Sequence, residues 1–173
     1  MAVAINGISG LKISSMSGEH WDDVARIYAQ GIAGGLATFE ADVPTWEAFS
    51  RSKNAGLNLV ALSARNEILG WTAAAATSTR PAYRGVIEHS VYVDRKHSGH
   101  GIGSTLLREL INRARELGYW TIQSSIIAAN DASRALHRKA GFREVGRRER
   151  IAQGARGEVA GQWLDTCLYE LRL

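Results

Sequence analysis

The feature that most constrains the fold is a strand-like segment that runs directly into a glycine-rich turn and then into an amphipathic helix. Residues 86–94 read VIEHSVYVD, a run rich in β-branched and aromatic residues that favours a strand. Gly99, Gly101 and Gly103 follow at alternate positions. Apolar residues then recur at helical spacing up to the stop at Gly118. This order predicts either an anion-binding turn or a flexible surface turn.

Glycines before a helix suit phosphate, because the first N–H groups of a helix are unpaired and carry a partial positive charge. Two nucleotide motifs are excluded by their spacing. The stretch GHGIGST lacks the lysine of the phosphate loop GxxxxGK[ST], and its GxGxG spacing differs from the GxGxxG of dinucleotide folds. Coenzyme A is the third candidate anion.

The remaining pattern predicts one domain over residues 1–173, of α/β class in its α+β form. We expect a single mixed, mostly antiparallel sheet with helices on both faces, because several consecutive strands precede one late βαβ unit. The expected strands are 11–15, 59–64, 68–77, 86–94, 119–128, 142–151 and 163–171, and the expected helices are 21–33, 45–54, 102–117 and 131–140.

Composition excludes several classes of protein. Hydrophobic residues make up 45% of the chain and charged residues 22%, which is typical of a globular domain. No apolar run approaches the ~18 residues of a membrane helix, and the first residues lack a secretory signal pattern. The single cysteine, Cys167, permits no intrachain disulfide. We therefore expect a cytoplasmic protein that does not bind membranes.

The formal net charge is +4, and much of the excess lies between Arg134 and Arg150. Three interpretations fit this excess: a solvated face, a surface for nucleic acid, or attraction of a small phosphorylated cofactor. No zinc-finger spacing, RNA-binding aromatic motif or basic zipper accompanies the charge, so we expect no nucleic-acid partner.

Two motifs together resemble the GNAT superfamily of N-acetyltransferases over nearly the whole chain. They are VYVDRKHSGHGIGSTLL, which begins at Val91, and NDASRALHRKAGF, which begins at Asn130. In the family's first signature a long polar residue stands where this chain has Ser98. The resemblance implies splayed strands at 86–94 and 119–128 with acetyl-CoA between them. The cofactor-binding residues that it implies are Val91, Tyr92, Val93, Ser98, Gly99, His100, Gly101, Ile102, Gly103, Ser104, Asn130 and Ser133.

Within that superfamily the chain is similar to the phosphinothricin acetyltransferases and their methionine sulfone and methionine sulfoximine relatives. The similarity rests on IYAQGIAGGLATFE from Ile27, RPAYR from Arg80, VIEHSVYV from Val86 and the WLD at Trp163. It implies acetylation of the α-amino group of a small amino-acid-like substrate by direct transfer. Residues 147–162 depart from the family's pattern, and this departure leaves the substrate open.

Glu88 and His137 are the candidate catalytic residues. Glu88 lies in the expected central strand, where a carboxylate needs a polar cleft or a partner. The resemblance implies a general base at this position, and an ion pair with Arg80 or Arg84 is the structural alternative. His137 stands where many GNAT proteins have a proton-donating tyrosine, and a helix-surface histidine is its alternative. His89 is expected on the opposite sheet face from Glu88.

Arg80, Tyr83 and Arg84, on the loop before the Glu88 strand, are candidates for binding a substrate carboxylate. Thr38 and Phe39 follow the first helix and are expected to cover the acceptor pocket. His97 and His100 have no third ligand nearby, so no metal is expected. We expect a homodimer, with Trp163 in the interface or the pocket. Two other functions stay open: a GNAT enzyme for another amine, such as a protein N-terminus or a polyamine, and a non-catalytic module that binds coenzyme A or nucleic acid.

Overall fold

The computed structural model describes residues 3–5 and 8–173. Within these residues eight strands form one sheet in the order β1-β2-β3-β4-β5-β6-β8-β7, and only the β5–β6 pair of strands is parallel. The strands are β1 (Val3–Ile5), β2 (Ile8–Ser15), β3 (Leu59–Leu62), β4 (Ile68–Ala76), β5 (Val86–Val93), β6 (Thr121–Ile127), β7 (Arg143–Gln153) and β8 (Trp163–Arg172). The predicted mixed, mostly antiparallel sheet is confirmed.

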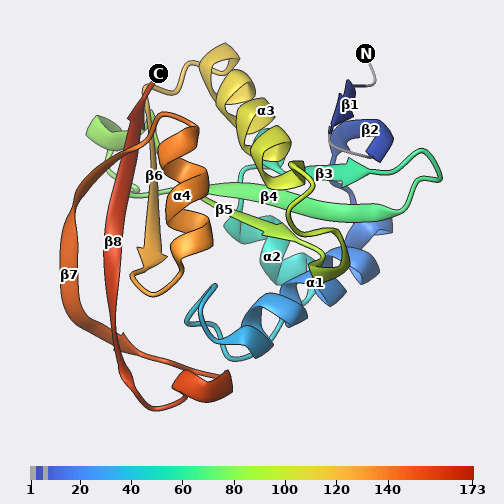
Figure 1. The fold of residues 1–173 in the computed structure, drawn as a ribbon. Helices are drawn as coiled ribbons and strands as arrows, with labels where there is room; N and C mark the ends of the chain where they lie inside the picture. Colours follow the sequence, from blue (N-terminus) through green and yellow to red (C-terminus); the bar gives the residue numbers. More distant parts are fainter. Residues whose placement is uncertain (1–2, 6–7) are drawn as a thin grey trace.

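In the described part of the chain four α-helices cover both faces of this sheet, as predicted (Figure 1). They are α1 (Trp21–Gly34), α2 (Trp46–Ser52), α3 (Ile102–Glu116) and α4 (Asp131–Lys139). Thr45 caps α2 by accepting a hydrogen bond from the Ala48 N–H, and Gly35 ends α1 in the left-handed region with φ of 74°.

Two apolar clusters hold the helices to the sheet, one on each face. The apolar stripe of α3 packs on one face, where Leu106, Leu107 and Leu110 are completely buried. On the other face α1 and α2 pack around Trp71, whose ring lies in a T-shaped contact 5.6 Å from Phe49. Each such fully buried side chain stabilises the fold by ~1.5–3 kcal/mol. The two clusters fix the sheet between the helices and so fix the site at its centre.

The sheet opens between its two central strands. The parallel pairing of β5 with β6 covers only Val86–Glu88 against Thr121–Gln123. Beyond Glu88, β5 continues along β4 as far as Val93, while β6 continues along β8 as far as Ile127. The two strands therefore diverge, as Figure 1 shows. Among the residues that the structure describes, the backbone groups of β5 that face β6 have no strand partner beyond this fork, and the predicted splay is confirmed.

One predicted boundary was wrong and one strand was missed. β2 begins at Ile8 rather than at Leu11, and β1 was not predicted at all. Gly10, at φ of 78°, interrupts the alternation of apolar and polar residues inside β2. The first half of this strand therefore could not be recognised from its periodicity. The other strands and the four helices match the predicted ones to within about three residues.

Candidate active site

The glycine turn after β5 forms an anion-binding helix start. Gly99 and Gly101 both have φ of 81°, a conformation that favours glycine. The first intrahelical hydrogen bond of α3 runs from the Thr105 N–H to the Gly101 carbonyl at 3.0 Å. The N–H groups of residues 102–104 thus have no partner within the helix, and no side chain from residues 3–5 or 8–173 caps this end. Such a start offers N–H donors and a positive dipole end to a phosphate.

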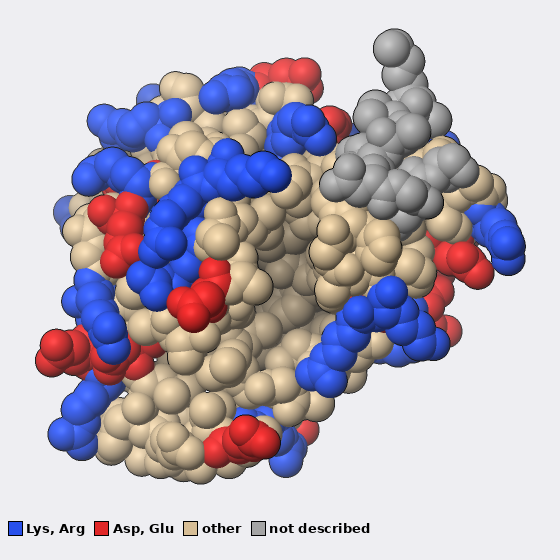
Figure 2. Space-filling view, in the orientation of Figure 1, with Lys and Arg blue, Asp and Glu red and all other residues tan. Residues whose placement is uncertain are grey.

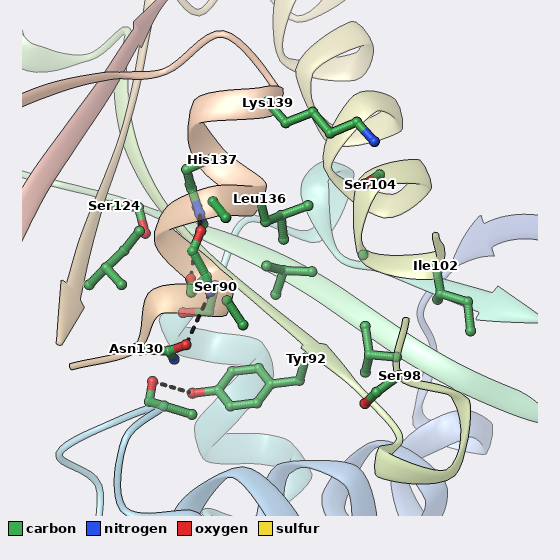
Figure 3. A pocket seen from close by; sticks show the side chains of 18 of the residues that line it. Ser90, Tyr92, Ser98, Ile102, Ser104, Ser124, Asn130, Leu136, His137 and Lys139 are labelled. Atoms are coloured by element: carbon green, nitrogen blue, oxygen red, sulfur yellow. Dashed lines mark hydrogen bonds between the residues drawn. The ribbon is translucent and has the colours of Figure 1, made fainter. Parts of the chain in front are cut away.

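A cavity of about 530 Å³ runs from this helix start into the fork between β5 and β6. Its walls come from both strands, from α3 and α4, and from the segment after α1 (Figure 3). Figure 2 shows the hollow at the centre of the molecule. The predicted cofactor residues that line it are Val91, Tyr92, Val93, Ser98, Gly99, Gly101, Ile102, Gly103, Ser104, Asn130 and Ser133.

His100 is the exception among the predicted cofactor residues. It is exposed, its Nδ1 lies 3.0 Å from the Ser98 carbonyl oxygen, and it is not among the residues that line the cavity in the described part of the chain. No group of three or more potential metal ligands occurs within residues 3–5 and 8–173.

Glu88 lies at the apex of the fork. The Gln123 amide, on the paired residue of β6, donates a hydrogen bond of 2.8 Å to the Glu88 carboxylate. Within the described residues neither Arg80 nor Arg84 forms an ion pair with Glu88, so the predicted structural alternative does not hold. The Glu88 carboxylate is partly exposed and keeps free acceptor positions beside its single amide donor.

His137 is buried against His89, and the hydrogen bonds define which nitrogens carry protons. The Nδ1 of His137 donates to the Ser133 carbonyl at 2.7 Å, because a carbonyl can only accept. In the neutral ring Nε2 is then an acceptor. Its partner at 3.0 Å is Nε2 of His89, which must therefore carry the proton.

Both imidazoles stay neutral near pH 7. Burial, followed by the nearby His137, lowers the pKa of His89 to about 3. Burial also lowers the pKa of His137, against the opposing effect of the Ser133 carbonyl. His89 Nδ1 is left as a buried acceptor with no hydrogen-bond partner in the described part of the protein. In this arrangement the Nε2 of His137 accepts a hydrogen bond from His89 and carries no proton that it could give.

Asn130 joins α4 to the segment that follows α1. Its side-chain oxygen accepts from the Ser133 N–H at 3.1 Å, and its amide donates to the Leu36 carbonyl at 3.0 Å. Tyr92, whose pKa burial raises, donates to the Ala37 carbonyl at 3.4 Å (Figure 3). The next residues, Thr38 and Phe39, are partly buried. These contacts hold the residues after α1 across the open end of the fork.

The arginines predicted to bind a substrate carboxylate lie on the exposed loop before β5. The Arg80 guanidinium lies 5.9 Å from the centre of the Tyr83 ring, and that of Arg84 lies 5.2 Å from the Trp120 ring. Tyr83 is 45% exposed. All three side chains are therefore accessible to a ligand, and two of them are held by aromatic contacts.

Three residues near the fork were missed or set aside by the sequence analysis. Gln123 carried no motif and becomes visible only through the strand register. Side chains alternate between the two faces of β5, and α4 packs on the face to which His89 points. Combining these two points would have predicted the contact between His89 and His137. Lys53 follows α2 and is half-buried near the Phe49 ring, and burial lowers its pKa while Glu40 and Glu88 oppose the shift. It is a cation on the same sheet face as Glu88.

The open sheet with its forked central strands is the fold of the GNAT family. Residues 21–142 match the model of the family described as "Acetyltransferase (GNAT) family", and the chain belongs to that family. The resemblance stated from the sequence is thereby confirmed. No helix in the described residues is long and apolar enough to cross a membrane.

Three similar proteins have names that state an activity. An L-methionine sulfoximine/L-methionine sulfone acetyltransferase of Pseudomonas aeruginosa is 37% identical over 115 residues, which span 66% of this chain and 64% of that protein. A phosphinothricin N-acetyltransferase of Alcaligenes faecalis is 33% identical over 154 residues, or 85% of this chain and 75% of that one. The phosphinothricin acetyltransferase of Sinorhizobium meliloti, solved in complex with AcCoA, superposes with a TM-score of 0.84 at 30% identity, over 94% of this chain and 88% of that one.

Proposed function

We propose that the protein transfers an acetyl group from acetyl-CoA to the α-amino group of a small amino-acid-like substrate of the methionine sulfone, methionine sulfoximine or phosphinothricin type. The observation that carries this proposal is the cavity at the fork, which runs from a phosphate-binding helix start to His89 and Ser90, the residues of β5 that directly follow Glu88. The relatives named for these three compounds support the choice of acceptor.

When bound, acetyl-CoA supplies the activated acetyl thioester. Three parts of the chain act on it and on the acceptor. The N–H groups at the start of α3 bind the diphosphate, and unpaired backbone groups of β5 beyond Glu88 bind the pantetheine arm. Glu88 takes a proton from the acceptor ammonium, directly or through water, while Gln123 holds its carboxylate in place.

The role of His137 as proton donor to the departing sulfur stays a prediction. In the neutral pair its Nε2 accepts from His89, so donation requires an extra proton at that atom or a rotation away from His89. Of the two catalytic candidates, the geometry gives more support to Glu88.

The test is release of coenzyme A thiol with methionine sulfone as acceptor, followed by a panel of other amines. Glu88→Gln keeps the size and hydrogen bonding of the side chain but removes its basicity. Turnover should fall ~10²–10⁴-fold at neutral pH and recover in part at high pH, where more acceptor is already the free amine. His137→Ala should show no such recovery. Normal turnover of Glu88→Gln at pH 7 would overturn the base assignment.

A second experiment tests which residues bind the carboxylate of the acceptor. If Arg80 or Arg84 binds the substrate carboxylate, methionine sulfone amide should react far more slowly than the free acid. Equal rates for acid and amide would remove both arginines from the acceptor site and favour Lys53, whose charge interacts with that of Glu88, as the group that binds the carboxylate.

We also propose that the protein forms a homodimer through the β7–β8 hairpin. Val145 and Ile151 on β7 and Trp163 on β8 are 44%, 47% and 51% exposed, which is unusual for large apolar side chains on one hairpin. Sedimentation equilibrium of the wild-type protein and of Trp163→Ser tests this expectation.

A further inference from the structure

The sheet face that carries Glu88 is open on one side of the fork. The apolar cluster that seats α1 and α2 on this face takes its strand residues from β3, β4 and β5 and, in the described part of the chain, none from β6, β7 or β8. Gln123 and Ser125 lie two residues apart on β6, so both project from the Glu88 face, about 7 Å apart along the strand. Ser125 also lines the cavity at the fork. An acceptor with its amino group at Glu88 therefore has open sheet beside it, toward Ser125.

A cation from β7 lies over this open part of the sheet. Arg148 donates from Nη2 to the Ser125 hydroxyl at 2.5 Å and from Nε to the Thr166 hydroxyl at 3.3 Å. The guanidinium thus crosses β8, which lies between β7 and β6, and reaches β6 on the face of Glu88 (Figure 1). Two of its five N–H donors are used in this way. Because the Arg148 side chain is exposed, the other three are accessible to a ligand.

The charge of Arg148 is not neutralised by a neighbour. Two other arginines of β7 pair with carboxylates on β8, namely Arg143 with Glu170 and Arg147 with Asp165. Within residues 3–5 and 8–173 no carboxylate lies at ion-pair distance from Arg148. An arginine that is held by hydroxyl groups alone keeps its charge and its planar fork of donors for an external group.

The backbone of β7 fixes the direction of this arginine. The strand bulges directly after Arg148, and Arg150, within the bulge, has φ of 48°. Asp165 accepts a hydrogen bond from the Arg150 N–H at 2.8 Å and one from Nε of Arg147 at 2.7 Å. It therefore holds the chain on both sides of Arg148. Bulges and left-handed residues other than glycine are common beside binding sites, where they direct a side chain.

From this arrangement we propose that Arg148 binds the side-chain oxygens of the acceptor and selects amino acids whose side chain ends in a sulfone, sulfoximine or phosphinate group. Two N–H groups on one edge of a guanidinium fit two acceptor atoms on one tetrahedral sulfur or phosphorus. The acceptor then lies along β6, with its amino group at Glu88 and its head group beside Ser125. The α-carboxylate is left to Arg80 or Arg84. This inference rests on the proposed acetyl transfer to amino acids of this type.

The experiment compares methionine sulfone with methionine, which lacks only the two sulfone oxygens, by release of coenzyme A thiol. Wild-type protein should have a kcat/KM about tenfold higher for the sulfone, since charge-assisted hydrogen bonds are at stake on a partly solvated surface. Arg148→Ala should lower kcat/KM for the sulfone about tenfold and that for methionine less than twofold, which removes the preference. The loss should fall mainly on KM, because Arg148 binds a part of the acceptor that does not react.

Phosphinothricin, whose phosphinate is anionic, separates the charge of Arg148 from its shape. Arg148→Lys keeps the charge but loses the fork, so it should recover part of the kcat/KM for phosphinothricin and little of the preference for the neutral sulfone. The kcat/KM of the wild type for phosphinothricin should fall as NaCl is raised, because salt screens exposed charges. A phosphinothricin rate that is the same in Arg148→Ala as in the wild type would overturn the proposal.

Arg143→Ala is the matched control, because it removes an arginine from the same face of β7, one that Glu170 already pairs. It should leave the sulfone-to-methionine ratio within about twofold. A wild type without preference, equal losses for both acceptors in Arg148→Ala, or an equal change of the ratio in Arg143→Ala would overturn the subsite while leaving acetyl transfer intact. No turnover of any of the three acceptors by the wild type would overturn both proposals. Thermal unfolding of each variant verifies that it is folded.

Discussion

His89 and His137 form a buried imidazole pair that makes stability depend on pH. Because both folded pKa values lie below the ordinary value near 6.5, the unfolded chain binds more protons once the pH falls under that value. Stability is therefore complete above pH ~6.5 and is lost on acidification, by up to about 1.4 kcal/mol per pH unit for each histidine. Urea unfolding at pH 7.5 and pH 5 measures this loss.

The variant His89→Gln distinguishes the contribution of this histidine pair to the pH dependence of stability from that of other titrating groups. His89→Gln can still donate a hydrogen bond to Nε2 of His137, but its amide does not titrate. The fall in unfolding free energy between pH 7.5 and pH 5 should be clearly smaller than in the wild type. An equal fall in both proteins would mean that the histidine pair does not cause the loss of stability on acidification.

Gly101 is a residue whose backbone conformation is tied to the anion-binding turn. At φ of 81°, any side chain would be strained there, so Gly101→Ala should distort the start of α3. We expect a loss of ~1 kcal/mol or more in stability and a clearly raised dissociation constant for coenzyme A. Gly103→Ala is the control, because its Cβ would meet Leu136 and Val93 at 3.4 and 3.5 Å, which is ordinary contact. Equal coenzyme A affinity in the two variants would contradict the prediction.

At the scale of elements, Asp94 fastens α1 to the end of β5. Its carboxylate is 3% exposed and accepts from Arg26 at 2.6 Å, from the Lys96 N–H at 3.0 Å and from Gln30 at 3.4 Å. Burial alone would raise the pKa of Asp94, but these hydrogen bonds outweigh it and leave the pKa below its ordinary value. The stability that they contribute is present above pH ~4 and is lost as the pH falls through the lowered pKa.

Replacing this carboxylate should loosen the packing of α1. Asp94→Asn should lower the unfolding free energy by ~1.5–3 kcal/mol, the usual size for hydrogen bonds to a buried charge. Asp23→Asn is the comparison, since Asp23 binds the same arginine at 3.1 Å but is 53% exposed. It should cost less than ~1 kcal/mol. Similar losses in both variants would show that burial does not decide the strength of this contact.

The elements themselves could be predicted from the sequence, because periodicity and capping residues mark them locally. Thr45, Gly118 and Asn130 lie next to the helix ends that they predict. Contacts between distant elements could not be predicted in this way. The bond from Gln123 to Glu88 depends on strand register, and the pairing of His89 with His137 depends on how α4 packs over β5. The one-domain prediction and the roles of the site residues stay predictions.

At the scale of the whole molecule, the β7–β8 connection closes over the segment that follows α1. A Cβ on Gly35 would lie 2.4 Å from the Arg156 carbonyl oxygen, and one on Gly157 would lie 2.9 Å from the Ala33 oxygen, so the two backbones touch. Arg156 also donates to the Ala41 carbonyl and to Asp42, each at 3.0 Å. Arg156 and Gly157, in this connection, thus support the segment that carries Thr38 and Phe39.

This contact predicts a selective effect on the acceptor. Arg156→Ala removes a contact that is 52% exposed, so stability should change by less than ~1 kcal/mol. The segment after α1 should nevertheless become more mobile, because Arg156 joins it to residues more than a hundred positions away in the chain. We expect the KM for methionine sulfone to rise several-fold while the dissociation constant for coenzyme A is unchanged. Arg147→Ala is the control, since its partner, Asp165, belongs to the same hairpin. An unchanged acceptor KM in Arg156→Ala, or an equal rise in Arg147→Ala, would show that this connection does not shape the acceptor site.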